Sequence, residues 1–248
     1  MSPLTVVSLF PERLNIHGDA ENAAVLVRRA SWRGLDASLR VIADPADAVD
    51  VDADLVTIGA GFDADAPEIL DGLRGMGPVL RRWRDAGVPL LAVGLGWDML
   101  STSVELESGA APGIGLFPGR SVASARRVGT IAVDSDLGPL TGYEYHVRDY
   151  ILAGDERPLG TVRRGTGNLA GEGENGAEGS TIGSLVGTAL RGPVLARNPR
   201  LADDLLDRAL VRRGGTVAAA GEAVDAAQAL ADLHALRANE IVRRNLGL

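Results

Sequence analysis

Four short apolar segments within the first hundred residues constrain the fold of this chain more than any other feature. They span residues 4–10, 37–43, 53–61 and 88–94, and helical patterns follow the first and the third of them. Segments of this length without strict polar–apolar alternation are typical of strands in a parallel sheet that is covered on both faces. Their order along the chain predicts an α/β fold with a mostly parallel central sheet and helices on both faces.

The helical segments between these strands carry start and stop signals. Asp19 is a candidate N-cap for the helix that follows it, and Gly34 is a candidate C-terminal stop for that helix. A second, amphipathic helix is predicted over 65–86, with a break or kink near 75–78, where the sequence reads GMGP. These helices are the ones expected to cover the sheet.

The pattern changes after about residue 104, where the segments become shorter and more β-like. Such segments lie at 128–135, 142–152, 159–165 and 182–192. The composition of residues 167–180 predicts a flexible polar loop. The second half of the chain is therefore expected to be rich in β-structure.

Two further helices are predicted near the C-terminus. One begins with Asn198 as cap and Pro199 as its first residue. The other is predicted over 221–244, with an apolar side formed by Val224, Ala227, Leu230 and Leu233. With 248 residues, the chain has the length of one α/β domain with additions.

Composition and charge exclude several classes of protein. The net charge of −8 argues against non-specific binding of nucleic acid, and no apolar run approaches the ~18 residues of a membrane span. The N-terminus lacks the basic start and cleavage site of a signal peptide, so a cytoplasmic protein is expected. The chain has no Cys, and all 25 of its basic residues are Arg. These absences exclude disulfides, a Cys nucleophile, Schiff-base chemistry and a P-loop lysine.

The segment VPLLAVGLGWDML, residues 88–100, joins a predicted strand to a predicted helix through a glycine turn. Gly94 is at the apex of this turn, and the small residues Ala92 and Gly96 flank it. Enzymes mount nucleophiles on elbows of this shape, where crowding requires small flanks and the apex often has positive φ. A second glycine turn, GAG at 59–61, could direct backbone N–H groups to the same place, as an oxyanion hole does. A purely structural turn is the alternative interpretation.

Five ordered segments resemble the motifs of one enzyme family. They read LNIHGDAENAAVLVRRASWRG, ADLVTIGAGFD, GVPLLAVGLGWDML, GYEYH and GTALRGPVLARNP. In this order and spacing they resemble class I glutamine amidotransferases of the cobyric acid synthase (CobB/CobQ) type. Within that type they are most similar to the GatD glutaminase subunits of lipid II isoglutaminyl synthase (MurT/GatD). The resemblance extends to about residue 213.

This resemblance implies a three-layer, flavodoxin-like class I glutamine amidotransferase fold with a β-rich C-terminal half. It implies a glutamine amidotransferase-like domain over 1–215 and a helical extension over 216–248 that packs on this domain. In the family, an elbow Cys attacks the side-chain amide of glutamine and a His transfers the proton. The ammonia passes to a Mur-ligase-like, ATP-dependent synthetase subunit in bacterial cell-wall synthesis. The resemblance implies no cofactor and no metal.

The sequence departs from the family at the two positions that carry this chemistry. Gly94 falls on the position of the nucleophilic Cys, and Arg191 falls on the position of the His. Glycine has no nucleophile, and an arginine does not deprotonate in proteins, so it cannot act as a general base. Residues 101–103, Ser-Thr-Ser, follow about two helical turns after Gly94 and are expected to point elsewhere. The sequence therefore predicts a pseudo-glutaminase with no intact catalytic residue.

Several other positions keep residue types that suit a ligand site. The candidates for ligand binding are Gly59, Ala60, Gly61, Leu95, Arg126, Glu144 and His146. By resemblance, Arg126 falls close to the arginine that grips the glutamine carboxylate; Arg127 is one position away, and a surface arginine is the other interpretation. His146 is either a structural hydrogen-bonding residue or part of the former site. His17 and His234 are expected to pack or to lie on the surface, and three scattered histidines predict no metal site.

Two placements of Arg191 are consistent with the sequence. Its charge could combine with Arg126 and the N–H groups of the elbow to bind a small anion. Alternatively, its side chain folds onto a carboxylate such as Glu144 and plugs the site. The corresponding functional hypotheses are a non-catalytic subunit that binds or regulates a Mur-ligase-like partner, a sensor of a small acidic ligand, and an enzyme with altered chemistry based on Glu144 or His146.

Overall fold

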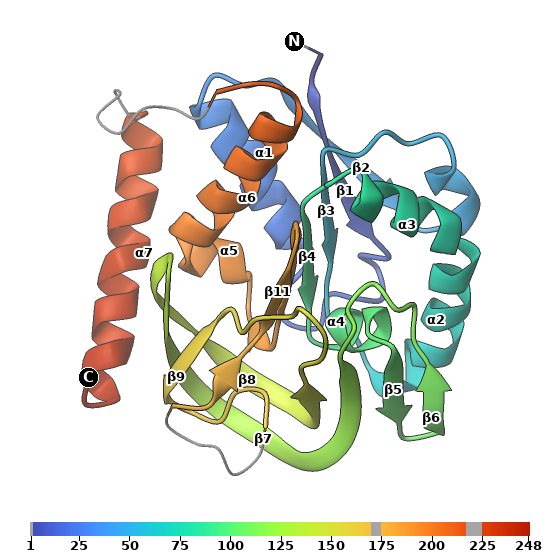
Figure 1. Cartoon of the computed structure of the whole chain (residues 1–248). Helices are drawn as coiled ribbons and strands as arrows, with labels where there is room; N and C mark the ends of the chain where they lie inside the picture. The colour runs from blue at the N-terminus through green and yellow to red at the C-terminus, as the bar shows by residue number, and fades with distance from the viewer. Residues whose placement is uncertain (1, 170–174, 217–224) are drawn as a thin grey trace.

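The computed structural model describes residues 2–169, 175–216 and 225–248, and Figure 1 shows it as a central sheet between helices. The strands of this sheet lie in the order β11-β12-β4-β3-β1-β2. Their bounds are Leu4–Leu9 (β1), Ala37–Ile42 (β2), Leu55–Ile58 (β3), Leu90–Val93 (β4), Ser180–Ile182 (β11) and Leu185–Thr188 (β12). Only β11 pairs antiparallel with its neighbour among these described strands. The prediction of a mostly parallel central sheet is confirmed.

The central strands of this sheet are buried because helices cover both faces. Every residue of β3 and β4 is buried, as expected for apolar runs without polar alternation. Helices α1 (Glu21–Trp32), α5 (Val194–Arg197) and α6 (Pro199–Arg212) lie on one side. Helices α2 (Ala66–Gly75), α3 (Gly77–Asp85) and α4 (Leu95–Leu100) lie on the other. Two short 3₁₀ turns, η1 (Pro45–Ala48) and η2 (Asp63–Asp65), precede α2.

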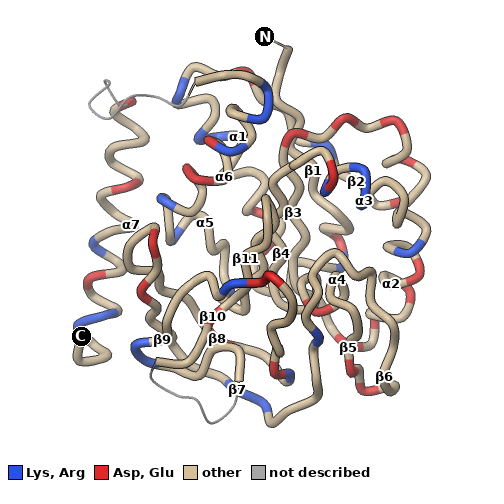
Figure 2. The backbone as a smooth tube through the Cα atoms, viewed as in Figure 1, with Lys and Arg blue, Asp and Glu red and all other residues tan. Residues whose placement is uncertain are grey.

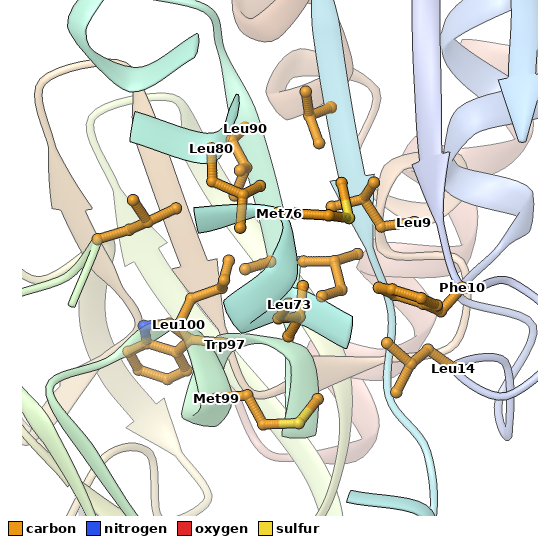
Figure 3. Close-up of a cluster of buried hydrophobic side chains, with 14 of the residues drawn as sticks. Leu9, Phe10, Leu14, Leu73, Met76, Leu80, Leu90, Trp97, Met99 and Leu100 are labelled. Atoms are coloured by element: carbon orange, nitrogen blue, oxygen red, sulfur yellow. The ribbon is translucent and has the colours of Figure 1, made fainter. Parts of the chain in front are cut away.

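Each face of the sheet has its own hydrophobic cluster. Figure 3 shows part of the cluster beneath α2 and α3, where Leu73 and Leu80 lie near Leu9 and Leu90 of the sheet. The α2–α3 break lies at Met76, within the predicted 75–78 segment, and the Met76 side chain is itself buried. The break therefore keeps both helices on the apolar face of the sheet.

The remaining strands form a second sheet below the first one in Figure 1. Its main part is a long antiparallel hairpin of β7 (Arg120–Ser135) and β8 (Gly138–Ile151). Its shorter strands are β5 (Ser103–Leu106), β6 (Gly109–Pro112), β9 (Gly160–Arg164), β10 (Ala177–Glu178) and β13 (Leu190–Arg191). The β-rich second half is confirmed. The loop predicted over 167–180 was wrong at 177–178, which form β10, and at Ser180, which begins β11; residues 170–174 of that loop lie outside the described residues.

Two predicted helix caps differ from the structure. Ala20, and not Asp19, occupies the N-cap position of α1, and its side chain makes no capping hydrogen bond. The Asp19 carboxylate instead accepts a hydrogen bond from the backbone N–H of Ala60. Asn198 does occupy the N-cap position of α6, but its side-chain amide bonds to the backbone of Thr141 and Val194. Asp19 and Asn198 thus form hydrogen bonds with residues far away in the sequence, Ala60 and Thr141, and the local rules for helix caps do not consider such partners.

The last helix, α7 (Ala226–Asn245), lies along the outer side of α1 and α5 and the hairpin. Of the helix predicted over 221–244, residues 221–224, including Val224, lie outside the described residues. Among the described residues, no helix combines the length and the apolar character needed to span a bilayer.

Candidate functional site

The turn between β4 and α4 is a sharp elbow whose apex is Gly94. Its φ of 53° and ψ of −120° lie in a region that glycine enters without steric cost and that other residues rarely adopt. The N–H of Gly94 donates to the carbonyl of Thr188 at 2.9 Å, and its carbonyl accepts from the N–H of Asp98 at 2.8 Å. The elbow is therefore fixed both to β12 and to the first turn of α4.

The small residues beside the apex allow the elbow to pack against the turn that follows β3. The N–H of Gly96 donates to the carbonyl of Gly59 at 3.1 Å. A Cβ atom at Gly96 would lie 2.5 Å from that same carbonyl oxygen, which is closer than atoms can approach. The prediction that crowding requires small flanking residues is confirmed at this position.

The guanidinium group of Arg191 fills the space above the apex. A Cβ atom at Gly94 would lie 1.6 Å from Nη1 and 2.0 Å from Cζ of Arg191. The Arg191 side chain comes from β13, is buried, and donates from Nη2 to the carbonyl of Tyr145 at 3.0 Å. Its Nε and Nη1 groups have no hydrogen-bond partner among the described residues. Arg191 thus occupies the place that a side chain at Gly94 would need.

Little space remains beside the filled elbow. The cavity lined by Gly94, Asp98, His146 and their neighbours has a volume of about 10 Å³, about enough for one water molecule. Two placements of Arg191 were predicted, and in the structure its side chain fills the site, as in the second of them. Its hydrogen-bond partner is the carbonyl of Tyr145 and not the carboxylate of Glu144, whose two oxygens accept hydrogen bonds from the N–H groups of Thr166 and Gly167.

Burial and nearby charges act on Arg191 in opposite directions. Burial lowers the pKa of Arg191, while the carboxylates of Asp19 and Asp98 raise it and Arg148 lowers it further. For Asp19, burial raises the pKa, and Arg191 and the N–H of Ala60 lower it. Asp19 and Arg191 therefore stabilise each other's charged forms although no direct hydrogen bond joins them in the described structure.

The glycine turn after β3 does not present all its N–H groups to the elbow. The Ala60 N–H, one of the predicted oxyanion-hole donors, bonds to Oδ2 of the buried Asp19 at 3.2 Å. Gly59 and Gly61 approach the backbone of Leu14 and Arg13 so closely that neither position has room for a Cβ atom. The turn thus keeps its compact shape, and the Asp19 carboxylate accepts the hydrogen bond of one of its N–H groups, that of Ala60.

Glu144 and His146 lie on the same face of β8, and Glu144 forms hydrogen bonds with the backbone of the loop at residues 166–167. Glu144 accepts hydrogen bonds from the N–H groups of Thr166 at 2.9 Å and Gly167 at 3.1 Å. The Nε2 atom of His146 lies 3.3 Å from Glu144, and its Nδ1 atom lies 3.1 Å from the carbonyl of Arg148. His146 also lines the small cavity at Gly94. It is therefore both a structural hydrogen-bonding residue and a wall of the site.

The two candidate arginines on β7 have different environments. Arg126 is exposed, and its Cζ atom lies 5.9 Å from the centre of the Tyr145 ring. Arg127 is half-buried and forms an ion pair with Asp149 at 2.6 Å and a hydrogen bond to the carbonyl of Arg148 at 2.7 Å. The pairing of β7 with β8 shifts register between Ala123 and Arg127, so Arg126 lies within this irregular part of the strand. The structure does not bring Arg126 into the buried cluster around Gly94.

Sequence reasoning missed the ion cluster centred on Arg148. This buried guanidinium bonds to Asp98 at 2.9 Å and to both oxygens of Asp63 at 2.6 and 2.7 Å. Burial lowers the pKa of Arg148, but the two carboxylates raise it by more. A signal was present, because Arg148 follows Glu144 and His146 at the period of two that puts strand residues on one face.

His17 packs edge-on against the rings of Tyr143 and Tyr145, with centroid distances of 5.9 and 5.3 Å, and burial lowers its pKa, with Arg191 adding to this effect. Helix α4 ends at Leu100, so residues 101–103 follow it instead of lying within it. The Ser101 hydroxyl bonds to the carbonyls of Asp98 and Ser103 and supplies no nucleophile at the elbow.

A buried carboxyl group supports the segment that carries Arg191. Oε1 of Glu178 accepts hydrogen bonds from the Thr188 hydroxyl and the Ala189 N–H, each at 2.9 Å, and Oε2 has no partner among the described residues. Burial raises the pKa of Glu178 to about 7, although these hydrogen bonds lower it. The folded protein therefore keeps a proton on Glu178 that the unfolded chain loses above its ordinary pKa of 4.5.

We expect Glu178→Gln to flatten the pH dependence of stability. In the parent protein, Glu178 makes the free energy of unfolding fall as pH rises from about 4.5 to about 7, by an amount of the order of 3 kcal/mol. The glutamine keeps the acceptor oxygen and cannot ionise, so the variant gains relative stability across this range. Urea denaturation of both proteins from pH 5 to pH 8 measures the effect, and parallel pH profiles would contradict it.

The chain is similar in sequence to one family of known proteins. Residues 5–199 match the CobB/CobQ-like glutamine amidotransferase domain family. The chain is 28% identical over 218 residues to the GatD subunit of lipid II isoglutaminyl synthase (glutamine-hydrolyzing) from Staphylococcus aureus (strain N315), covering 86% of this chain and 87% of that protein. It is 26% identical over 217 residues to the GatD subunit from Streptococcus pneumoniae (strain ATCC BAA-255 / R6), covering 86% and 82%.

A solved structure supports the same fold. A crystal structure of a glutamine amidotransferase superposes with a TM-score of 0.59 at 14% identity, covering 82% of this chain and 98% of that one. At this level of identity the likeness concerns the fold alone. The predicted class I glutamine amidotransferase fold and the predicted family resemblance are confirmed.

Proposed function

The chain belongs to the CobB/CobQ-like glutamine amidotransferase domain family, and from this premise we propose that it is a catalytically degenerate, GatD-like member of it. In this proposal it is a pseudo-glutaminase of the bacterial cytoplasm. It serves as a non-catalytic subunit that binds or regulates a Mur-ligase-like, MurT-type amidating partner in cell-wall or related metabolism. Residues 1–215 form its amidotransferase-like domain, and residues 216–248 form a helical extension.

The single observation that carries this proposal is the guanidinium of Arg191 in the space above Gly94. Covalent glutamine hydrolysis needs a nucleophile at the apex and a base that accepts its proton. Gly94 offers no nucleophilic atom, and Arg191 stays protonated and donates its hydrogen bonds. The same guanidinium fills the volume in which an amide carbon would have to approach the elbow.

The proposed partner follows from the relatives. Two relatives that align with more than four-fifths of their length are subunits of lipid II isoglutaminyl synthase. A protein that keeps this fold without the glutaminase chemistry can still occupy the position of such a subunit. Its synthetase partner would then take free ammonia or another amine in place of ammonia from glutamine.

We expect ammonia release from glutamine to stay at background, with the protein alone and with a Mur-ligase-like partner added. The absence of a nucleophile should reduce turnover by many orders of magnitude relative to an intact glutaminase. The S. aureus GatD protein, which is named as a subunit of a glutamine-hydrolyzing enzyme, is the positive control. Glutamine-dependent ammonia above background would mean that Gly94 does not take the place of the nucleophile.

Association tests the other half of the proposal. The protein should co-purify with a Mur-ligase-like protein encoded beside it in the same genome, and should not co-purify with a Mur ligase that acts alone. If this protein and the neighbouring Mur-ligase-like protein elute separately during size-exclusion chromatography, the subunit hypothesis is wrong. The glutaminase result and the association result are independent, so each half can fail separately.

One observation favours a second candidate function. The Nε and Nη1 groups of Arg191 are buried donors that find no partner among the residues the structure describes, and they could bind a small acidic ligand if the side chain moved. The protein would then be a sensor, or an enzyme with altered chemistry in the same pocket. Glutamate or another small dicarboxylate should raise the melting temperature in that case, and no such shift is expected if Arg191 is a permanent plug.

A further inference from the structure

Strand β2 lies at an open edge of the central sheet. It pairs in parallel with β1, and no other strand of the described chain pairs with it. The carbonyls of Asp36 and Ile42 each accept a hydrogen bond at 2.8 Å from a backbone N–H group on the β1 side. Because consecutive residues of a strand direct their backbone groups to opposite edges, Ala37, Leu39 and Val41 direct theirs away from β1. Their N–H and C=O groups are therefore in position to pair with a further strand.

The side chains of β2 are divided between the two faces of the sheet. Ala37 packs against the hydrophobic cluster on the α1 side, whereas Ile42 belongs to the cluster beneath α2 and α3. Side chains alternate along a strand, so Leu39 and Val41 share the α1 side and Arg40 lies on the other. Leu39 and Val41 are 46% and 45% exposed. An edge strand with an exposed apolar face and an unpaired backbone is a site at which another strand can add.

Two charged residues of this edge are available to select the added strand. Asp36 directly precedes β2 and Arg40 is within it, and both are exposed. Neither side chain forms an ion pair or a hydrogen bond within the described part of the chain. Figure 2 shows acidic and basic residues interspersed over the molecule, so single charges, and not a field of one sign, select a partner here. The added strand needs an acidic residue opposite Arg40 and a basic residue opposite Asp36.

We propose that the open edge of β2 is the interface between two copies of this chain, whose β2 strands pair antiparallel about a twofold axis at Ser38. In this register Arg40 of each copy lies opposite Asp36 of the other, so the ion pair forms twice, as in an isologous interface. On the α1 side, Ala37 of each copy lies opposite Leu39 of the other, a small residue against a large one. The edge of β2 itself thus supplies both charges that the added strand needs, whereas an unlike partner would have to present them at the same spacing in reverse order.

The backbone of β2 is consistent with the same register. Ala37 and Leu39 both direct their backbone groups to the open edge, so Ala37 of one copy and Leu39 of the other exchange N–H to C=O hydrogen bonds, and the twofold axis repeats this exchange. An axis at Leu39 would also pair these groups, but it would put Asp36 opposite Ile42. An axis at Arg40 would oppose two arginines. The backbone therefore restricts the possible registers, and the two charges select one of them.

A groove beside β2 has room for side chains of the second copy. It has a volume of about 730 Å³, and its walls near the edge include Val25 and Trp32 of α1 and Ala37 and Leu39 of β2. The groove continues across α1 to α5 and α7. In the proposed register the apolar side chains of the added strand lie on the α1 side, at the mouth of this groove. Pairing of the two strands therefore covers apolar surface as well as backbone groups.

The central test exchanges the two charges. In sedimentation velocity over about 1 to 100 μM, we expect the parent protein to dimerise with increasing concentration. Asp36→Arg and Arg40→Asp should each associate at least tenfold more weakly, because each replaces two attractive pairs by two repulsive ones. Mixed in equal amounts, the two variants should form a heterodimer, in which every opposed pair again combines an acidic and a basic residue.

Asp155→Arg is the matched control for the change of charge. Asp155 is exposed and lines a hollow beside β11, at the opposite edge of the sheet, so this variant should dimerise like the parent protein. Circular dichroism verifies that the variants are folded. A parent protein that is monomeric throughout, or a dimer that both charge variants leave intact, overturns the proposal. If Arg40→Asp instead loses a Mur-ligase-like partner and the parent protein never self-associates, the edge belongs to that partner and the proposal is wrong.

Cross-linking tests the register. The chain has no cysteine, so single cysteines can be introduced without background reaction. The two copies of residue 38 form a non-hydrogen-bonded pair, with Cα atoms about 4.5 Å apart, so Ser38→Cys should form disulfide-linked dimers by itself. Val41→Cys is the control on the same strand, because its two copies would lie about 20 Å apart and should not link. Linking of Leu39→Cys in place of Ser38→Cys would indicate the register without the ion pairs and overturn the proposed arrangement.

Discussion

We expect Gly94→Cys to destabilise the protein by about 4 kcal/mol and to leave glutaminase activity at background. Two effects contribute to this loss. A side chain at position 94 would have to adopt a φ of 53° with a ψ of −120°, and its Cβ would collide with the Arg191 guanidinium at 1.6 Å. Activity does not return because Arg191 remains in the place of a general base and covers the apex. Chemical denaturation and an ammonia assay measure the two outcomes.

Control substitutions separate the two effects. Gly183 has a similar φ of 56° and open space around its Cβ position, so Gly183→Ala reports the cost of a side chain at positive φ without a collision, at about 1 kcal/mol. Gly94→Ala should cost clearly more. The double variant Gly94→Cys/Arg191→His should recover about 2 kcal/mol relative to Gly94→Cys, because the shorter ring relieves the collision. Equal costs at Gly94 and Gly183 would show that Arg191 does not fill the apex in solution.

The second large effect is expected for Arg148→Met, at about 3–5 kcal/mol of lost stability. The methionine preserves much of the side-chain volume and removes the charge. The carboxylates of Asp98 and Asp63, whose side chains are only 10% and 14% exposed, would then lack their counter-charge. Removing one member of a buried ion cluster leaves the others uncompensated, which is the costly case.

The matched control is an ion pair on the surface. Arg74 pairs with Asp71 at 2.8 Å, and their side chains are 43% and 77% exposed. Arg74→Met should therefore cost less than about 1 kcal/mol. Urea denaturation of the three proteins at neutral pH measures the contrast. If Arg148→Met and Arg74→Met cost the same, the Asp63–Arg148–Asp98 cluster is hydrated in solution and does not hold the site together.

The parts of the fold that could be predicted from sequence have local signals. Strands β1, β3 and β4 are continuous apolar runs, and burial on both faces explains their composition. The elbow was recognisable because Ala92, Gly94 and Gly96 place small residues at alternating positions around a turn. In these segments a few neighbouring residues contain the physical reason for the structure.

The parts that could not be predicted depend on distant partners. Asp19 has the composition of an N-cap, but it lies against the turn at Ala60, 41 residues away in the sequence. Arg148 meets Asp63 across 85 residues. The placement of Arg191 over Gly94 depends on the register of β13 with β8, which no local pattern specifies. Helix periodicity identified an apolar side of the last helix, but not that Leu230 and Leu233 would face away from the protein.

The contact between Gly94 and Arg191 also limits the mutational routes open to this lineage. A single substitution that restores a side chain at 94 meets the guanidinium, and a single substitution that removes the guanidinium leaves an elbow without a nucleophile. On the proposed descent from a glutaminase, the two changes are epistatic, and each reversion alone is either harmful or without benefit. Selection that acts on single substitutions therefore retains Gly94 together with Arg191, even under conditions that would favour glutamine hydrolysis.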